Sequence, residues 1–195
     1  MANIAAVTAD GTSINLGTAD IEDTTQQSIY AVKDALTTTG LGDVRASDRM
    51  VRQTFTLNEA NTSASISSNP VNWTTQDGWW VDLPHSGERV NTDMALQFGT
   101  LSVATAIPSG DACSSIGSSW RYYLKAENGN ALADPAGELW SSNSLIVGQS
   151  WVKLDNGQTR ILRQNSDGKI VAERPPGGGG AAGVPQRNSW RELAD

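Results

Sequence analysis

The sequence predicts an all-β fold, and three observations lead to that prediction. Charged residues make up only 18% of the chain, while Gly, Ser, Thr, Asn and Asp are abundant, as in secreted β-proteins rich in turns. Asp-Gly and Asn-Gly pairs recur, and such pairs supply the positive φ that tight hairpins need. Short segments of strand length lie between them. The pairs are Asp10-Gly11, Asp77-Gly78, Asn128-Gly129, Asn156-Gly157 and Asp167-Gly168.

The first third of the chain is the least clearly patterned. In residues 26–36, Ile29, Val32 and Leu36 fit one face of a helix, while residues 29–32 also fit a short strand, and periodicity leaves both open. Residues 37–48 and 58–72 are rich in Thr, Ser, Asn and Gly. We expect them to be surface connections, with some ordered pairing, that decorate the sheets.

The middle of the chain predicts three strands. Residues 78–83 form the first, which Pro84 ends, and residues 85–89 turn the chain with His85 as a solvated loop residue. Residues 94–107, long and mostly apolar or small, form the second. Residues 120–124 form the third, and this sheet unit ends at Asn128-Gly129.

Residues 151–173 predict a three-stranded meander, because two turn pairs separate three short segments. A two-residue type I′ loop at Asn156-Gly157, with Gly157 at positive φ, places Val152 opposite Ile161 and Leu154 opposite Thr159. The same arithmetic at Asp167-Gly168 places Asn165 opposite Ile170 and Gln164 opposite Val171.

The end of the chain changes character. Residues 174–188 contain the run of Pro, Gly and Ala that neither buries a core nor holds a strand ladder, so we expect a flexible tether. Ser189 and Glu192 fit a capping box around Trp190, but too few residues follow for a stable isolated helix. The chain is therefore expected to divide into a sheet domain (1–173), a tether (174–188) and a docking segment (189–195) that carries Trp190 and Leu193.

Composition narrows the function classes. A formal net charge of −7 leaves no basic surface for phosphates or an anionic bilayer, so nucleic acid is not expected as a partner. No apolar stretch reaches the length of a membrane span, and residues 1–10 lack a secretory signal pattern. Cys113 is the only cysteine, which excludes an internal disulfide and a zinc site of several thiolates. Metal and cofactor sites are not expected.

Several motifs, in order and spacing, resemble a known family. The most specific run is Gly78-Trp79-Trp80-Val81-Asp82-Leu83-Pro84 followed by Gly87-Glu88-Arg89-Val90. Further matches are residues 16–20, 27–32, 99–101, 105–108, 111–113, 118–120 and 189–193. Over nearly its whole length the chain is similar to the carboxy-terminal part of the β-propeller of the PilY/PilC family, the surface proteins at the tip of bacterial type IV pili.

The resemblance implies a partial β-propeller of about three blade-like antiparallel sheets with long decorated loops, and it favours a strand for residues 26–36. It also implies a non-enzymatic role in pilus assembly and surface adhesion, and an extracellular place at the pilus tip or outer cell surface. The absent leader then indicates a fragment or a processed form. Minor pilins, other pilus-tip proteins, the rest of the propeller or a second copy are the expected partners. The calcium loop and Arg-Gly-Asp tripeptide of some members do not occur in this sequence.

Two alternative functions stay open. Residues 123–129 resemble blade hairpins of quinoprotein dehydrogenases, a propeller class of enzymes, although Cys113 has no adjacent cysteine as in related members. The chain could instead be a stand-alone extracellular binding module. Trp79, Trp80 and Trp120 are expected to pack between sheets, and Asp82, Glu88 and Arg89 to serve turns and strand pairing rather than catalysis.

Overall fold

The computed structural model describes residues 4–9 as backbone and residues 24–33, 42–109 and 117–176 in full. This part of the chain is built from strands joined by turns and contains no helix, so the predicted all-β class is confirmed. The strands are β1 (Ile4–Ala9), β2 (Ser28–Lys33), β3 (Met50–Gln53), β4 (Phe55–Leu57), β5 (Ser63–Ile66), β6 (Gly78–Asp82), β7 (Ala95–Gln97), β8 (Thr100–Pro108), β9 (Gly117–Lys125), β10 (Gly137–Ser141), β11 (Ile146–Lys153), β12 (Thr159–Asn165) and β13 (Ile170–Glu173).

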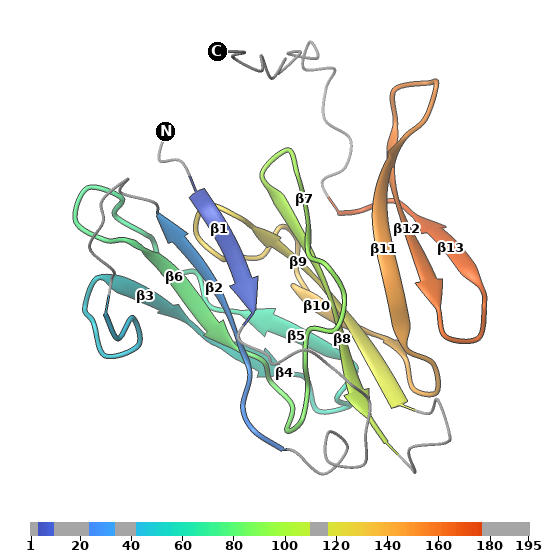
Figure 1. Cartoon of the computed structure of the whole chain (residues 1–195), viewed down its shortest axis with the longest axis horizontal. Coiled ribbons are helices and arrows are strands. Elements are labelled where there is room, and N and C mark those ends of the chain that lie inside the picture. Colours follow the sequence, from blue (N-terminus) through green and yellow to red (C-terminus); the bar gives the residue numbers. More distant parts are fainter. Residues whose placement is uncertain (1–3, 10–23, 34–41, 110–116, 177–195) are drawn as a thin grey trace, which may run out of the picture.

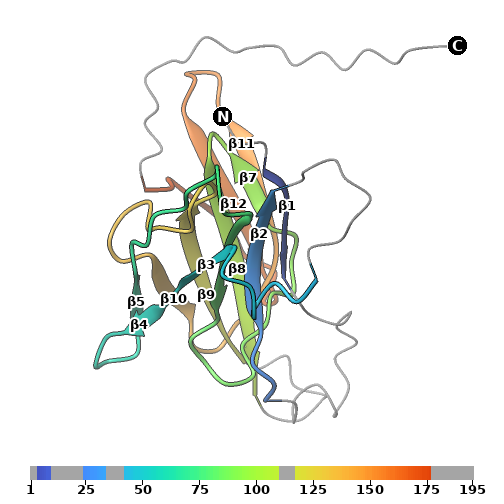
Figure 2. The same cartoon turned by 90° about the vertical axis from the view of Figure 1, so that its left-hand side faces the viewer.

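The strands form three sheets that stand face to face (Figures 1 and 2). The first sheet has the order β1-β2-β6-β3, the middle sheet β4-β5-β10-β9-β8-β7, and the last sheet β11-β12-β13. Neighbouring strands are antiparallel, except that β3 runs parallel to β6. Such stacked antiparallel sheets are compatible with propeller blades.

The main hydrophobic core lies between the first and middle sheets. Trp79 and Val81 point into it from β6, and Trp120, Tyr122 and Leu124 point into it from β9. The Trp79 side chain is fully buried, and its Nε1 donates a hydrogen bond to the Ala126 carbonyl oxygen at 2.9 Å. Truncating a buried aromatic of this kind costs about 3–5 kcal/mol, so this layer supplies much of the stability. The expected packing between sheets is confirmed for Trp79 and Trp120, but not for Trp80, which belongs to a separate cluster on the outer face of the first sheet.

The middle sheet is buried on both faces. Along β8, Leu101 and Val103 face the main core, while the alternating Ser102 and Ala104 face the last sheet, and all four are buried. Burial on both sides explains why residues 94–107 are mostly apolar or small rather than alternating with charged residues.

The Asp77-Gly78 pair is not a hairpin turn, and that prediction was wrong. Gly78 is the first residue of β6 and has a φ of 152°. A Cβ atom built on Gly78 would lie 1.9 Å from the carbonyl oxygen of Ala31 in β2. The glycine is therefore required by the close approach of two backbones.

The predicted meander at 151–173 is confirmed as β11–β13, but the predicted register was wrong by one residue at both turns. The Leu154 amide donates to the Gln158 carbonyl at 2.8 Å, so Lys153 opposes Thr159 and Trp151 opposes Ile161. The second hairpin likewise sets Gln164 opposite Ile170. Each loop has three residues, with Gly157 (φ 78°) and Gly168 (φ 82°) alone at positive φ. This is the turn-plus-bulge loop, which needs one left-handed residue instead of two.

Three further strand predictions are confirmed. The strands at 78–83 and 120–124 are present, and residues 28–33 form a strand. Residues 94–107 are two strands, β7 and β8, because Phe98 and Gly99 form a tight turn between them. Residues 58–72 contain β5, an inner strand whose Ala64 is fully buried, so this stretch does more than decorate the sheets. The Asp10-Gly11 turn, residues 34–41, Cys113, the tether beyond residue 176 and the docking segment lie outside the described residues.

We expect Gly78→Ala to lower the free energy of unfolding by about 2 kcal/mol or more, because the methyl group would force β6 away from β2. Urea unfolding measured by tryptophan fluorescence tests this. Gly148→Ala is the matched control, since its Cβ meets nothing within 4 Å and its free energy should change by less than about 0.5 kcal/mol. Equal effects of the two substitutions would contradict the account of Gly78.

Candidate functional site

The Gly-Trp-Trp run places Trp80 on the outer face of the first sheet. There Trp80 packs with Tyr30 and Met50 in a second, smaller apolar cluster. The guanidinium carbons of Arg45 and Arg52 lie 4.4 Å and 5.0 Å from the Trp80 ring centroid, within cation–π range. The Asp82 carboxylate, which terminates β6, pairs with both arginines at 2.5 Å and 3.1 Å. Trp80 and Asp82 thus hold the side chains of Arg45 and Arg52 on the outer face of this sheet.

Glu88 is the best-enclosed carboxylate of the described residues. It is fully buried in the loop before β7, and its Oε1 accepts hydrogen bonds from Thr105 Oγ1 at 2.5 Å and Tyr122 Oη at 2.6 Å. Its Oε2 accepts from the His85 backbone amide at 3.2 Å and lies 2.7 Å from His85 Nδ1. A buried charge is tolerated only when it is satisfied in this way.

His85 is not a solvated loop residue, and that prediction was wrong. Its ring lies 4.5 Å from the Trp120 ring, between centroids, and its Nε2 lies 3.0 Å from the side-chain oxygen of Asn61. His85 therefore ties the loop after β6 to the β4–β5 turn and to β9. No sequence periodicity signals this contact, because its partners are far apart along the chain.

The same enclosure affects Tyr122. Burial first, and then the neighbouring charge of Glu88, raise the pKa of the Tyr122 phenol well above its ordinary value. The phenol therefore keeps its proton and remains a donor to Glu88. Through these hydrogen bonds Glu88 links the loop after β6 to Thr105 of β8 and Tyr122 of β9 at the main core.

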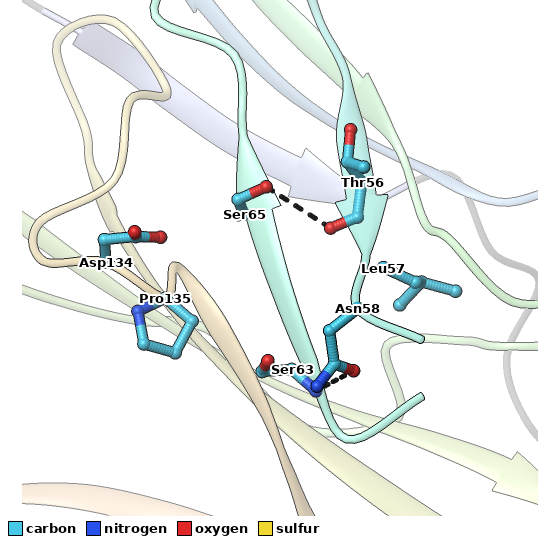
Figure 3. Close-up of a pocket in the computed structure, with 7 residues that line it drawn as sticks. All are labelled: Thr56, Leu57, Asn58, Ser63, Ser65, Asp134 and Pro135. Carbon is cyan, nitrogen blue, oxygen red and sulfur yellow. Dashed lines mark hydrogen bonds between the residues drawn. The ribbon is translucent and has the colours of Figure 1, made fainter. Parts of the chain in front are cut away.

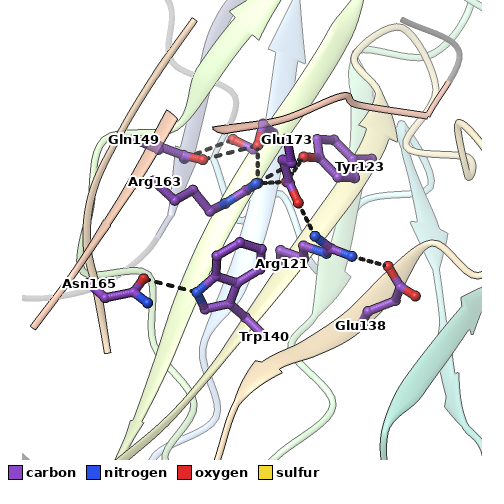
Figure 4. Close-up of polar contacts among 9 residues, drawn as sticks. Arg121, Tyr123, Glu138, Trp140, Gln149, Arg163, Asn165 and Glu173 are labelled. Atoms are coloured by element: carbon purple, nitrogen blue, oxygen red, sulfur yellow. Dashed lines mark hydrogen bonds and ion pairs between the residues drawn. The ribbon is translucent and has the colours of Figure 1, made fainter. Parts of the chain in front are cut away.

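The junction between the middle and last sheets is polar (Figure 4). Arg163 of β12 is fully buried, and its guanidinium donates to Tyr123 Oη and to Ser102 Oγ, each at 2.9 Å. Glu173, the last residue of β13, pairs with both Arg163 and Arg121. Burial lowers the pKa of Arg163, the direction expected for a cation in a low-dielectric site.

Further polar contacts cross the same junction. Trp140 Nε1 donates to Asn165 Oδ1 at 2.9 Å, and the Trp140 ring lies beneath the guanidinium groups of Arg121 and Arg163 (Figure 4). Three buried donors in or beside this junction lack a hydrogen-bond partner, namely Nε of Arg121, Nε of Arg163 and Nε1 of Trp151. A buried donor without a partner costs free energy, so we expect the last sheet to separate more easily than the two sheets that share the apolar core.

A shallow hollow of about 240 Å³ lies beside the β4–β5 hairpin (Figure 3). Its polar groups already serve the hairpin: Asn58 Oδ1 accepts from the amides of Thr62 and Ser63, and Ser65 Oγ donates to the Thr56 carbonyl. Among the lining side chains, Asp134 carries the one charged group beside the hollow. The lining residues are Thr56, Leu57, Asn58, Ser63, Ser65, Asp134 and Pro135.

The tip of the β7–β8 hairpin is the candidate contact site. Phe98 has a φ of 50°, and Gly99 has a φ of 75°, which are the signs of φ in a type I′ turn. Positive φ is a strained conformation for a bulky aromatic residue, and this turn normally takes Asn, Asp or Gly. Phe98 is nevertheless 82% exposed, and Leu96 on the same hairpin is 52% exposed. Strain combined with an exposed aromatic is typical of a contact residue.

Sequence reasoning did not find this tip, although a Phe-Gly pair between two apolar segments was a readable signal. No protein-family model, curated protein or solved structure matches the chain. Among the described residues, no helix is long and apolar enough to cross a membrane. The described side chains include no group of three or more His, Cys, Asp or Glu that could hold a metal ion.

Glu88→Gln should lower the free energy of unfolding by roughly 1–3 kcal/mol, because the new amide group cannot accept every hydrogen bond that the carboxylate accepts. Glu138→Gln is the control, since that side chain is 45% exposed and should change stability by less than about 1 kcal/mol. A double-mutant cycle with Tyr122→Phe should give a coupling of at least about 0.5 kcal/mol. Strict additivity would show that the two groups do not interact.

Glu173→Gln should loosen the last sheet alone. We expect faster amide hydrogen exchange in β11–β13 and little change in β6, β8 and β9, because Glu173 joins two arginines at the polar junction. Asp167→Asn is the control in the same sheet, since Asp167 pairs only with the exposed Lys169 at the second hairpin. Equal acceleration across all three sheets would mean that the junction does not define a separate unit.

Proposed function

We propose that this chain is part of a bacterial surface protein similar to the PilY/PilC family and acts without catalysis at the tip of type IV pili. Its role there is in pilus assembly and surface attachment. The observation that carries the proposal is the run from Gly78 to Arg89, whose order and spacing resemble the run in that family's propeller.

The position of this run supports the proposal. Trp79 fills the main core, Trp80 and Asp82 close the outer face of the first sheet, and Glu88 braces the loop that follows. Residues that fill the core and fix a loop in this way are expected in other proteins that have the same stacked sheets. The similarity therefore concerns residues on which the architecture depends.

The chemistry of the ionisable groups favours a structural or binding role. Glu88 already accepts hydrogen bonds from Thr105 and Tyr122, and Glu173 is already paired with Arg121 and Arg163. A catalytic acid or base needs a free approach to substrate, and these groups face one another instead.

The partners in this proposal are minor pilins or other pilus-tip proteins, and the location is the extracellular end of the pilus or the outer cell surface. The stand-alone binding module is the second candidate, and Phe98 is the observation that favours it. In either role the β7–β8 hairpin tip is the contact that reaches the partner.

Deleting the gene in the bacterium that encodes the chain tests the proposal. We expect fewer pili by electron microscopy and fewer cells attached to glass, with both restored by the unaltered gene. Loss of attachment with normal piliation would favour the binding module. If deletion changed neither pili nor attachment, the pilus role would be overturned.

Phe98→Asn separates contact from stability at the hairpin tip. Asparagine tolerates positive φ, so the free energy of unfolding should rise by about 1 kcal/mol. Attachment of cells carrying the variant should nevertheless fall toward that of the deletion strain, because an exposed aromatic anchor is lost. Leu154→Asn on the β11–β12 hairpin is the control and should leave attachment unchanged. Full attachment by Phe98→Asn cells would exclude Phe98 as the contact.

A further inference from the structure

Among the strands that the structure describes, the last sheet forms one end of the stack. The inner face of this sheet carries Ile161 and Arg163, both fully buried against the middle sheet. Because side chains alternate along a strand, Leu162 and its cross-strand neighbour Ala172 lie on the opposite face. Figure 1 shows β11–β13 at the edge of the stack, with the middle sheet on one side only.

This outer face carries an apolar stripe. Val152 opposes Arg160, Leu162 opposes Ala172, and Ile170 opposes Gln164, so the apolar side chains follow a diagonal across the three strands. Ile170 is 67% exposed, Ala172 is exposed, and Val152 and Leu162 are half-buried. We call Val152, Leu162, Ile170 and Ala172 the outer stripe.

We propose that the docking segment, residues 189–195, packs Trp190 and Leu193 onto the outer stripe. Trp190 supplies a large apolar surface, and Leu193 lies three residues further on, the spacing at which two side chains share one face of a helical turn. Two apolar side chains among polar ones match the outer stripe, which is a narrow row of apolar side chains on a polar face.

The reach of the tether supports this occupant. The last sheet ends at Glu173, and the tether begins at the next residue. The tether has 15 residues, 174–188, and a Gly-rich chain of that length spans roughly 20 Å on average. Neighbouring strands lie about 4.8 Å apart, so all of the outer stripe is within that reach from β13.

The size of the outer stripe also favours a tethered segment over a second copy. A stable interface between separate chains needs about 800 Å² and 20–30 residues on each side. Four apolar side chains fall well short of that. A short flexible tether raises the effective concentration of its end to the millimolar range, so a small contact suffices.

Arg160 adds a specific contact on the same face. It lies beside the outer stripe, opposite Val152. Elsewhere in the molecule arginines stack on the rings of Trp80 and Trp140. Arg160 is placed to stack on Trp190 in the same manner.

Paramagnetic relaxation on the full chain tests the proposal. A nitroxide is attached at Asp195→Cys in a Cys113→Ser background, and methyl resonances of Ile, Leu and Val are recorded. We expect the methyl signals of Ile170, Leu162 and Val152 to broaden at least several-fold more than those of Leu96, which is exposed elsewhere. The double substitution Trp190→Ala with Leu193→Ala should abolish the difference, and Arg160→Gln should reduce it.

A mixed sample identifies the occupant. Spin-labelled chains without isotopes are combined with isotope-labelled chains that carry no nitroxide. An absence of broadening in the mixture supports docking within one chain. Broadening of the outer stripe in the mixture equal to that in the single-chain sample would assign the stripe to a second copy and overturn the proposal. Uniform broadening of all surface methyls, or broadening that survives the double substitution, would overturn it as well.

Discussion

The structure depends on one constraint, which is that β8 and β9 are covered on both faces. Leu101 and Val103 must complete an apolar core on one side while Ser102 and Ala104 meet the last sheet on the other. Strands buried on both faces need a sheet on each side, so β8 and β9 lie in the middle of the stack. On β8 the small Ser102 leaves room for the buried Arg163 side chain, to which it is hydrogen-bonded, while large aromatic side chains fill the space toward the first sheet.

The two faces of the middle sheet are held by different chemistry. The main core gains from burying Trp79, Trp120 and Tyr122, a gain that needs no particular partner geometry. The junction on the other side relies on Arg163 and Glu173, whose attraction must first offset the cost of removing charges from water. The interface between the first and middle sheets therefore rests on apolar burial, while the interface between the middle and last sheets depends on its ion pairs.

Much of this fold could be predicted from sequence, and the failures have physical causes. Turn glycines correctly located the meander. The register depended on whether Asn156 and Gly157 both take positive φ or Gly157 alone does, and the identity of the pair does not decide between these two loops. The sequence predicted a turn at Gly78, because it cannot show that the backbone of Ala31 lies against this residue. The strand β5 was missed because its sequence, Ser63–Ile66, is mostly small and polar, and only Ala64 is fully buried. The contacts of His85 and the exposure of Phe98 arise only from tertiary placement.

The position of Glu173 has a mechanical consequence. A pulling force transmitted along the chain beyond residue 176 reaches β13 first, and the carboxylate that locks the polar junction lies at the loaded end of that strand. That junction is held by ion pairs, whereas the first two sheets share the buried aromatic core. Under tension from that end, we expect the last sheet to separate before the main core, so that the molecule lengthens in a step while its first two sheets stay folded.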